Sequence, residues 1–500
     1  MIICGLKLTH DGAIALIDEG KLIFCYEMEK LNGNPRHSFF NLSMNEIEEI
    51  FEEHGYKFDR IDKLVIDGWD NEIGESGQQP DDLSIKSKDD FSLEISLDGE
   101  NKFFAGLAKY GHIITNESVL DESYFSYPDQ NLSYNSYMHV SGHIFGAYCT
   151  SPFAKDKSDS FILVWDGGMP PQLFYYNYNL NQVENLGILF PILGYIYINF
   201  PAEFEPFSLM KKDLAIAGKV MAYVAKGKVN ASLKFKLKSL ITELEEETKR
   251  ELSSPVVMAM VTQEFIRKSV EYGKLEQIPD QDMITTFHVA MKELMIERLQ
   301  EKVNQHPDKQ KNICLVGGCA LNIKWNSAVR SCGTFKQVWV PPFPNDSGSA
   351  LGTACCEMIK HGQIRELKWD VYKGPAIFSN LESNLDWVTA SYDLRMLANL
   401  IHRASIPILM LNDRAELGPR ALGNRSILAP ANSKSMKSIL NDIKKREDYR
   451  PIAPICLESY ASEVFDPGTP DPYMLYDHEV RENWRERVAA ICHLDNTARL

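Results

Sequence analysis

Two histidines four residues apart have the types and spacing needed for chemistry. His139 and His143 lie in the stretch MHVSGHIFGAYC, among small and apolar residues. On a helix this spacing places both imidazoles on one face, one turn apart. Such a pair is either structural or part of a metal site, and the spacing alone leaves both interpretations open.

Two aspartates favour the metal interpretation. Asp166 follows the apolar stretch SFILVW and precedes two glycines, and Asp346 precedes SGSALG. Aspartates at strand ends face the cleft in which open α/β sheets bind ligands. Imidazoles combined with carboxylates favour iron or manganese over a structural zinc, which prefers thiolates. The alternative for each aspartate is a loop cap beside glycine.

Three other polar residues, His10, Asn322 and Asn326, lie close in the sequence to glycines. His10 lies at a predicted hairpin tip, HDG, where its ordinary pKa suits a general base. An exposed turn residue would have the same signature. The glycine pair of GGCALN lets the backbone approach a nucleotide, and Asn322 and Asn326 offer hydrogen bonds to ribose or base.

Cations gather in GPRALGNRSILAP and in NDIKKREDYRPIAP behind it. Planar guanidinium groups match phosphate oxygens two at a time. The net charge of the whole chain is −16, so this local excess favours an anion site over a basic surface. The cations are Arg420, Arg425, Lys444, Lys445, Arg446 and Arg450.

The elements that position these residues follow an α/β pattern. Residues 1–30 are predicted to form strands joined by the turns THDG and DEGK. Several apolar strands end in polar, glycine-rich loops, with predicted helices between them, including 228–254 and one from 282. The pattern lapses over 362–384, which we interpret as a linker between segments 1–361 and 385–500. No internal repeat is visible.

Composition limits the class of protein. The charge of −16 disfavours non-specific binding to nucleic acid or anionic membranes. The N-terminus lacks a secretory signal, and the apolar stretch from Leu186 contains a proline and is too short to span a membrane. Ten cysteines without framework spacing indicate reduced thiols in a cytoplasmic protein.

Taken in order, the motifs resemble those of one enzyme family. HDG, HxxxH, DGG, GGCALN, VPP with DxGxALG, and ExGPRALGNRSIL with RExxRPxAP occur in sequence along essentially the whole chain. The set resembles the O-carbamoyltransferases of natural-product and nodulation-factor biosynthesis. The finer resemblance is to the enzymes that carbamoylate saxitoxin-type alkaloids.

This resemblance implies an actin-like (ASKHA) domain over 1–361 and a YrdC-like α/β domain over 385–500. In the second, ATP with Mg²⁺ and carbamoyl phosphate would give carbamoyl-adenylate and pyrophosphate. In the first, Fe²⁺ or a similar divalent metal would hold this intermediate while an acceptor hydroxyl attacks it. The implied partners are small molecules, without nucleic acid or membrane, and a homodimer is compatible with the sequence.

The resemblance also assigns roles by motif. His10 would be the catalytic base. The metal ligands would be His139, His143, Asp166 and Asp346. The adenylate would contact Arg36, Asn322 and Asn326, and ATP or carbamoyl phosphate would contact Arg420, Arg450 and Arg499.

The sequence departs from the family pattern at four places, one of which is GKVMAYVAKG, where the family has GKVMGLA. Arg36 stands where the family usually has Lys, and Asn496 stands for Gly in HLDNTAR. The chain ends at TARL, where relatives continue, so we expect an incomplete second domain. A catalytically impaired homologue or a nucleotide-binding scaffold is therefore the alternative function, and a sugar-kinase-like phosphotransferase is a third.

Overall fold

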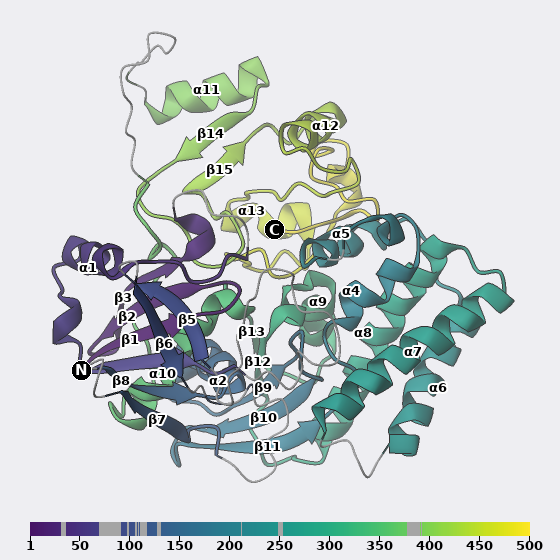
Figure 1. Cartoon of the computed structure of the whole chain (residues 1–500). Coiled ribbons are helices and arrows are strands. Elements are labelled where there is room, and N and C mark those ends of the chain that lie inside the picture. The colour runs from purple at the N-terminus through teal and green to yellow at the C-terminus, as the bar shows by residue number, and fades with distance from the viewer. Residues whose placement is uncertain are drawn as a thin grey trace.

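The computed structural model describes the chain except residues 32–36, 70–91, 98–99, 106–107, 109, 111–117, 128–131, 212, 249–253, 378–390 and 392. Within the described ranges the chain is an α/β structure, as predicted, and its two largest sheets are mixed (Figure 1).

The first sheet has the strand order β3-β2-β1-β4-β8-β7. Strands β1 to β3 form an antiparallel meander, β4 and β8 run parallel to β1, and β7 is antiparallel to β8. The strands predicted in residues 1–30 are confirmed. The bounds are β1 Ile2–Lys7, β2 Ala13–Asp18, β3 Lys21–Glu27, β4 Lys63–Asp67, β7 Glu122–Tyr127 and β8 Leu132–Tyr137, with a separate hairpin of β5 Ser92–Leu97 and β6 Glu100–Ala105.

The second sheet has the order β11-β10-β9-β12-β13 and repeats this arrangement, because a three-stranded meander is again followed by two parallel strands. The duplication agrees with the actin-like architecture that the resemblance implies, although no sequence repeat reveals it. The bounds are β9 Ser160–Val164, β10 Gln172–Asn177, β11 Gln182–Ile188, β12 Asn312–Val316 and β13 Gln337–Trp339.

Two buried helices pack against each other next to the sheets. Helix α2 (His139–Cys149) follows β8, and α10 (Ser349–Lys360) follows β13. A Cβ atom at Gly352 would lie 2.1 Å from the carbonyl oxygen of Gly142, so the two backbones touch where the helices cross and glycine is needed there. The crossing holds the first turn of α2 beside the first turn of α10.

A helical layer covers the second sheet and shares its apolar core (Figure 1). The helices predicted over 228–254 and from 282 are confirmed as α6 and α8. The helices of residues 1–361 other than α2 and α10 are α1 Met44–Glu53, α3 Pro152–Lys155, α4 Ile196–Asn199, α5 Ala215–Tyr223, α6 Ala231–Thr248, α7 Pro255–Leu275, α8 Asp280–Asn304 and α9 Ile323–Ser331.

The C-terminal segment packs onto the first. Lys30 Nζ donates to the carbonyl oxygen of Gly418 at 2.8 Å. Gly418 has φ +80°, and a Cβ atom on it would lie 2.0 Å from the carbonyl oxygen of Pro342. The elements of the C-terminal segment are α11 Leu394–Ala404, β14 Ile408–Leu411, β15 Arg425–Leu428, α12 Lys434–Ile443, α13 Glu458–Val464, β16 Phe465–Asp466, β17 His478–Val480 and β18 Thr497–Ala498.

The predicted linker is only partly described. Its first part lies against the first segment, where Lys368 N donates to Gly20 O at 2.8 Å and Leu367 N donates to Cys149 O at 2.9 Å. Its later part bonds to the C-terminal segment, where Gly374 N donates to Ala415 O at 3.0 Å and Ile377 N donates to Asp413 O at 2.8 Å. Residues 378–384 lie outside the described ranges. Among the described residues, no helix combines the length and apolar character needed to cross a membrane.

Candidate active site

The four predicted ligands come together in one buried cluster. One ligand atom from each of His139, His143, Asp166 and Asp346 lies within 4.8 Å of the others. The Nε2 atoms of the two histidines are 3.1 Å apart, and Asp346 Oδ1 lies 3.3 Å from His139 Nε2 and 3.6 Å from His143 Nε2. Oxygens of Asp166 lie 4.0 Å from each Nε2 atom.

Local structure explains this convergence. Helix α2 places both imidazoles on one face, Asp166 follows strand β9, and Asp346 immediately precedes α10. Asp166 is fixed from both sides, because the backbone N–H of Gly318 donates to Oδ1 at 2.6 Å and the Tyr110 hydroxyl donates to Oδ2 at 2.5 Å. The strand ends and the α2–α10 crossing therefore aim four donor groups at one point.

Two further charged residues lie behind this cluster. Asp67 Oδ2, at the end of β4, accepts hydrogen bonds from His139 Nδ1 at 2.7 Å and from Lys7 Nζ at 2.9 Å. Lys7 Nζ also lies 3.2 Å from Asp346 Oδ2. Burial by itself would lower the pKa of Lys7, but Asp67 and Asp346 outweigh it and raise the pKa. The site therefore contains a buried lysine held as a cation.

The donor set fits a divalent transition metal. Hydrogen bonding of His139 Nδ1 to Asp67 leaves Nε2 as the ligand atom, and this nitrogen faces the other three groups. Two carboxylates and two imidazole nitrogens face one another in this buried space, and a bound cation, whether a proton or a metal ion, offsets the buried negative charge. Two imidazoles and two carboxylates without a thiolate suit iron or manganese.

His10 lies at the edge of the cluster. Its side chain is 27% exposed, its Nε2 lies 3.6 Å from Asp346 Oδ2, and its Nδ1 lies 3.1 Å from Asp11 Oδ2. Burial would lower the pKa of His10, but the carboxylates of Asp346 and Asp11 outweigh burial and raise it. The imidazole thus has one nitrogen held by Asp11 and the other facing the cluster.

Asp11 also contacts a second imidazole. Its Oδ1 lies 2.8 Å from His37 Nδ1, and its own backbone has φ +55°. Both histidines lower the pKa of the Asp11 carboxyl by hydrogen bonding and charge, against the effect of burial. Asp11 is therefore an anionic bridge between His10 and His37. Arg36, which precedes His37 in the sequence and is a predicted adenylate contact, lies outside the described residues.

The two predicted adenylate asparagines are both buried at the start of α9. Asn322 caps the helix, since its Oδ1 accepts from Trp325 N at 3.3 Å. Asn326 Nδ2 donates to Ala320 O at 2.7 Å and to Leu475 O at 2.9 Å. Both donors of Asn326 are thus used within the protein, which leaves its Oδ1 as the atom for a ligand.

The predicted phosphate contacts occupy two places. Arg420 donates to the carbonyl oxygen of Leu321, 3.3 Å away, beside the start of α9. Arg450 and Arg499 form a second group together with Arg446, close enough for their charges to repel. Burial first, and then mutual repulsion of these cations, lower the pKa values of Arg446 and Arg499 to about 10. Such crowding of cations suits a polyanion.

Glu416 organises the loop that carries Arg420. This fully buried carboxylate accepts from the backbone N–H groups of Leu422, Asn424 and Arg425 at 2.9, 2.7 and 3.1 Å. Arg425 Nε adds a bond to Oε2 at 3.2 Å. These bonds outweigh burial and lower the pKa of Glu416. The loop is therefore a shaped turn, as its glycines predict.

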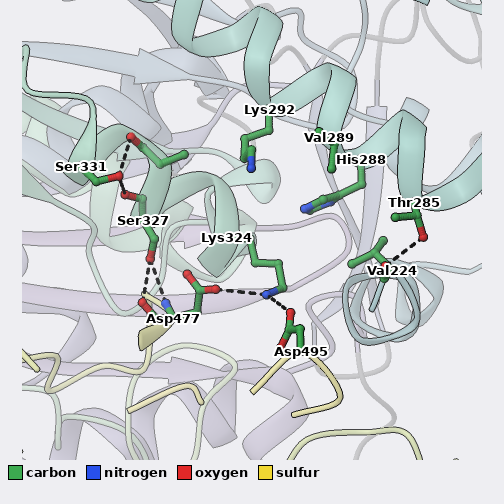
Figure 2. A pocket seen from close by; sticks show the side chains of 11 residues that line it. Val224, Thr285, His288, Val289, Lys292, Lys324, Ser327, Ser331, Asp477 and Asp495 are labelled. Carbon is green, nitrogen blue, oxygen red and sulfur yellow. Dashed lines mark hydrogen bonds and ion pairs between the residues drawn. The ribbon is translucent and has the colours of Figure 1, made fainter. Parts of the chain in front are cut away.

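A cavity of about 400 Å³ lies apart from the metal ligands, between α8, α9 and the C-terminal segment (Figure 2). Lys324 lines the cavity, and its Nζ forms ion pairs with Asp477 Oδ2 at 3.1 Å and Asp495 Oδ2 at 2.6 Å. Lys292 and His288 point toward it from α8. Its volume lies within the range of small-molecule sites. The sequence motifs did not predict it, because its lining comes from five separate stretches of chain, which are Val224, part of α8, part of α9, Asp477 and Asp495.

Comparison with known proteins assigns the family. The models of the carbamoyltransferase N-terminus and C-terminus match residues 2–355 and 398–500. Nodulation protein U of Rhizobium tropici is 40% identical over 524 residues, covering 100% of this chain and 85% of the relative. The 3'-hydroxymethylcephem-O-carbamoyltransferase of Streptomyces clavuligerus is 28% identical over 504 residues, covering 100% and 86%.

Likeness to solved structures is weaker. The ADPNP-bound activator of the 2-hydroxyisocaproyl-CoA dehydratase of Clostridium difficile covers 73% of this chain and 97% of its own at 13% identity. The TM-score of 0.36 is too low to define fold or function. The matches to both family models and to full-length relatives decide the matter: the chain belongs to the carbamoyltransferase family, enzymes that transfer carbamoyl groups.

Proposed function

We propose that this enzyme is an ATP-dependent O-carbamoyltransferase. Carbamoyl phosphate, water and ATP would give carbamoyl-adenylate, phosphate and pyrophosphate, and an acceptor hydroxyl would then take the carbamoyl group and release AMP. The observation that carries the proposal is the convergence of four ligand atoms within 4.8 Å, with His10 at their edge, in a carbamoyltransferase.

His139, His143, Asp166 and Asp346 would hold iron or a similar divalent metal. Bound there, such a metal would polarise the carbamoyl carbonyl and stabilise negative charge on its oxygen. The chain's own contribution is to keep the donors fixed and dry, because all four side chains are buried.

His10 would be the base that takes the hydroxyl proton. With Nδ1 held by Asp11, Nε2 is the atom that accepts this proton, and it faces the cluster. Asp11 would hold the productive tautomer and balance the charge that forms on the imidazole. A partly exposed His10 leaves room for the acceptor to approach.

The C-terminal segment, proposed to be YrdC-like, would form the adenylate. Arg450 and Arg499, together with Arg446, would hold the phosphates of ATP, accompanied by Mg²⁺, and carbamoyl phosphate. Arg420 would connect the adenylate-forming segment with the first segment, since it donates to the carbonyl oxygen of Leu321, the residue before Asn322. Asn322, Asn326 and Arg36 would contact the adenylate. We place the segments at 1–361 and 385–500.

The proposed acceptor is a hydroxylated natural product, with a saxitoxin-type alkaloid as the first to test. A hydroxymethyl acceptor is supported by the Streptomyces clavuligerus relative, a 3'-hydroxymethylcephem-O-carbamoyltransferase. A cytoplasmic location is supported by ten free cysteines.

A product assay tests the function. The purified protein is incubated with carbamoyl phosphate, ATP, Mg²⁺ and Fe²⁺ and a panel of hydroxylated acceptors, and carbamoylated product and pyrophosphate are measured. Product with pyrophosphate supports the proposal. Nucleotide binding without product identifies an impaired homologue or scaffold, and ADP with a phosphorylated product identifies a phosphotransferase.

A further inference from the structure

We propose that Asp67 and Lys7 are positioning residues of the metal centre. Asp67 orients His139, Lys7 orients Asp346, and together they match the charge of the site to a divalent ion. This inference rests on the proposed metal centre and adds to it two residues outside the predicted ligand set.

Asp67 fixes the ligand nitrogen of His139. The two side chains are buried, and Asp67 Oδ2 accepts from His139 Nδ1 at 2.7 Å. The proton on Nδ1 leaves Nε2 with a free lone pair, directed at His143 and Asp346. A carboxylate behind a ligating imidazole fixes its tautomer and ring orientation and raises its basicity.

Lys7 fixes the orientation of Asp346. Its side chain is 1% exposed, and a lysine so deeply buried needs a paired anion. Nζ lies 2.9 Å from Asp67 Oδ2 and 3.2 Å from Asp346 Oδ2. Lys7 thus attracts Oδ2 of Asp346 as an ion pair, and Oδ1 is the oxygen that faces both imidazoles.

The pair also sets the charge of the site. Lys7 and Asp67 neutralise each other, so Asp166 and Asp346 supply two negative charges, and imidazoles that ligate a metal are neutral and supply none. A divalent ion balances this buried set, in which uncompensated charge is costly. Removal of Lys7 alone would leave an extra negative charge and favour a trivalent ion.

Two double variants isolate the hydrogen bond to His139. Lys7→Met/Asp67→Asn and Lys7→Met/Asp67→Leu both remove one buried cation and one buried anion, so both keep the net charge of the site and both lose the contact of Lys7 with Asp346. The introduced asparagine still accepts from His139 Nδ1, whereas the introduced leucine does not. Zn²⁺ dissociation constants are measured by competition with a chromogenic chelator. We expect the leucine variant to bind about ten- to a hundredfold more weakly, and equal affinities would overturn the role of Asp67.

A separate measurement tests the proposal that Lys7 and Asp67 match the charge of the site to a divalent ion. The ratio of Ga³⁺ affinity to Zn²⁺ affinity is measured for the wild type, for Lys7→Met and for Lys7→Met/Asp67→Asn. The single variant carries the extra negative charge, so its ratio should exceed the other two by about tenfold or more. Three equal ratios would overturn the proposed charge matching.

A buried carboxylate elsewhere in the same segment gives the matched control. Glu357 accepts from Asn135 Nδ2 at 2.9 Å and from the Tyr137 hydroxyl at 2.8 Å, and these bonds involve none of the four ligands. Glu357→Gln should bind Zn²⁺ like the wild type, and a loss equal to that of the leucine variant would overturn the inference. A wild-type protein that binds no Zn²⁺ would instead overturn the metal centre itself.

Discussion

The Nδ1 atom of His10 lies 3.1 Å from a carboxylate oxygen of Asp11, its neighbour in the chain. Adjacent residues rarely face the same way, and this contact depends on the positive φ of Asp11, +55°. The backbone around it is tied down, because Gly12 N donates to Ser38 O at 2.8 Å. The proposed base is thus held by a carboxylate whose own position is fixed.

Asp11→Asn should therefore slow carbamoyl transfer without affecting adenylate formation. The asparagine amide would donate to Nδ1 and favour the tautomer with the proton on Nε2, which is the wrong one for a base. We expect transfer from preformed carbamoyl-adenylate to fall by about a hundredfold or more. Asp18→Asn, at the end of β2, is the control. A rise in KM for the acceptor with an unchanged kcat would contradict the role.

His10→Ala should remove the base itself. Transfer to the acceptor should fall by about 10²- to 10⁴-fold, and pyrophosphate release from ATP and carbamoyl phosphate should remain largely intact. Both rates are measured on one preparation, with product quantified by mass spectrometry. An equal loss of both activities would count against His10 as the base of the transfer step.

The ligand cluster could be predicted because each of its members carries a local signal. The i, i+4 spacing of His139 and His143 needs only a helix, and an aspartate between a strand and glycines is recognisable without a fold. The same rule would have found Asp67, which ends strand β4 and precedes Gly68. Lys7 had a weaker signal, as one charged residue within the apolar stretch IICGLKL.

Other features could not be predicted because they depend on tertiary contacts. The two sheets share their topology, yet their strands share no sequence pattern, since many sequences satisfy one pattern of burial. The bonds of the Asn326 amide hydrogens to Ala320 O and to Leu475 O of the C-terminal segment had no sequence signal. The contact of Asn326 with the adenylate, which its motif predicts, stays a prediction. Contacts between distant parts of the chain decide such roles.

Arg420→Ala should give the opposite result to His10→Ala. Arg420 lies in the loop held by Glu416, and its guanidinium donates to Leu321 O. This guanidinium is proposed to contact phosphate. Pyrophosphate release should fall by about tenfold or more, as expected for the loss of a charge-assisted contact. Transfer from preformed carbamoyl-adenylate should survive. Arg395→Ala, on the exposed helix α11, is the control, and undiminished pyrophosphate release would contradict the role of Arg420.

His288 makes stability depend on pH in a way that can be isolated from the metal site. Burial, then the charges of Lys324 and Lys292, lower the pKa of His288 to about 3 from its usual 6.5. Between these values the unfolded chain binds a proton at this residue and the folded chain does not. The free energy of unfolding should therefore fall with falling pH, by about 1.4 kcal/mol per pH unit from this group.

His288→Gln removes this titration and keeps a polar partner for the Tyr197 hydroxyl, which lies 2.8 Å from Nδ1. Unfolding by urea is measured for wild type and variant at pH 7, 6 and 5. Groups common to both proteins cancel in the difference, so the stability of the wild type relative to the variant should fall as the pH falls from 6 to 5. The same substitution at the exposed His402 is the matched control. Parallel pH curves for wild type and His288→Gln would show that His288 is protonated in the folded state as readily as in the unfolded state.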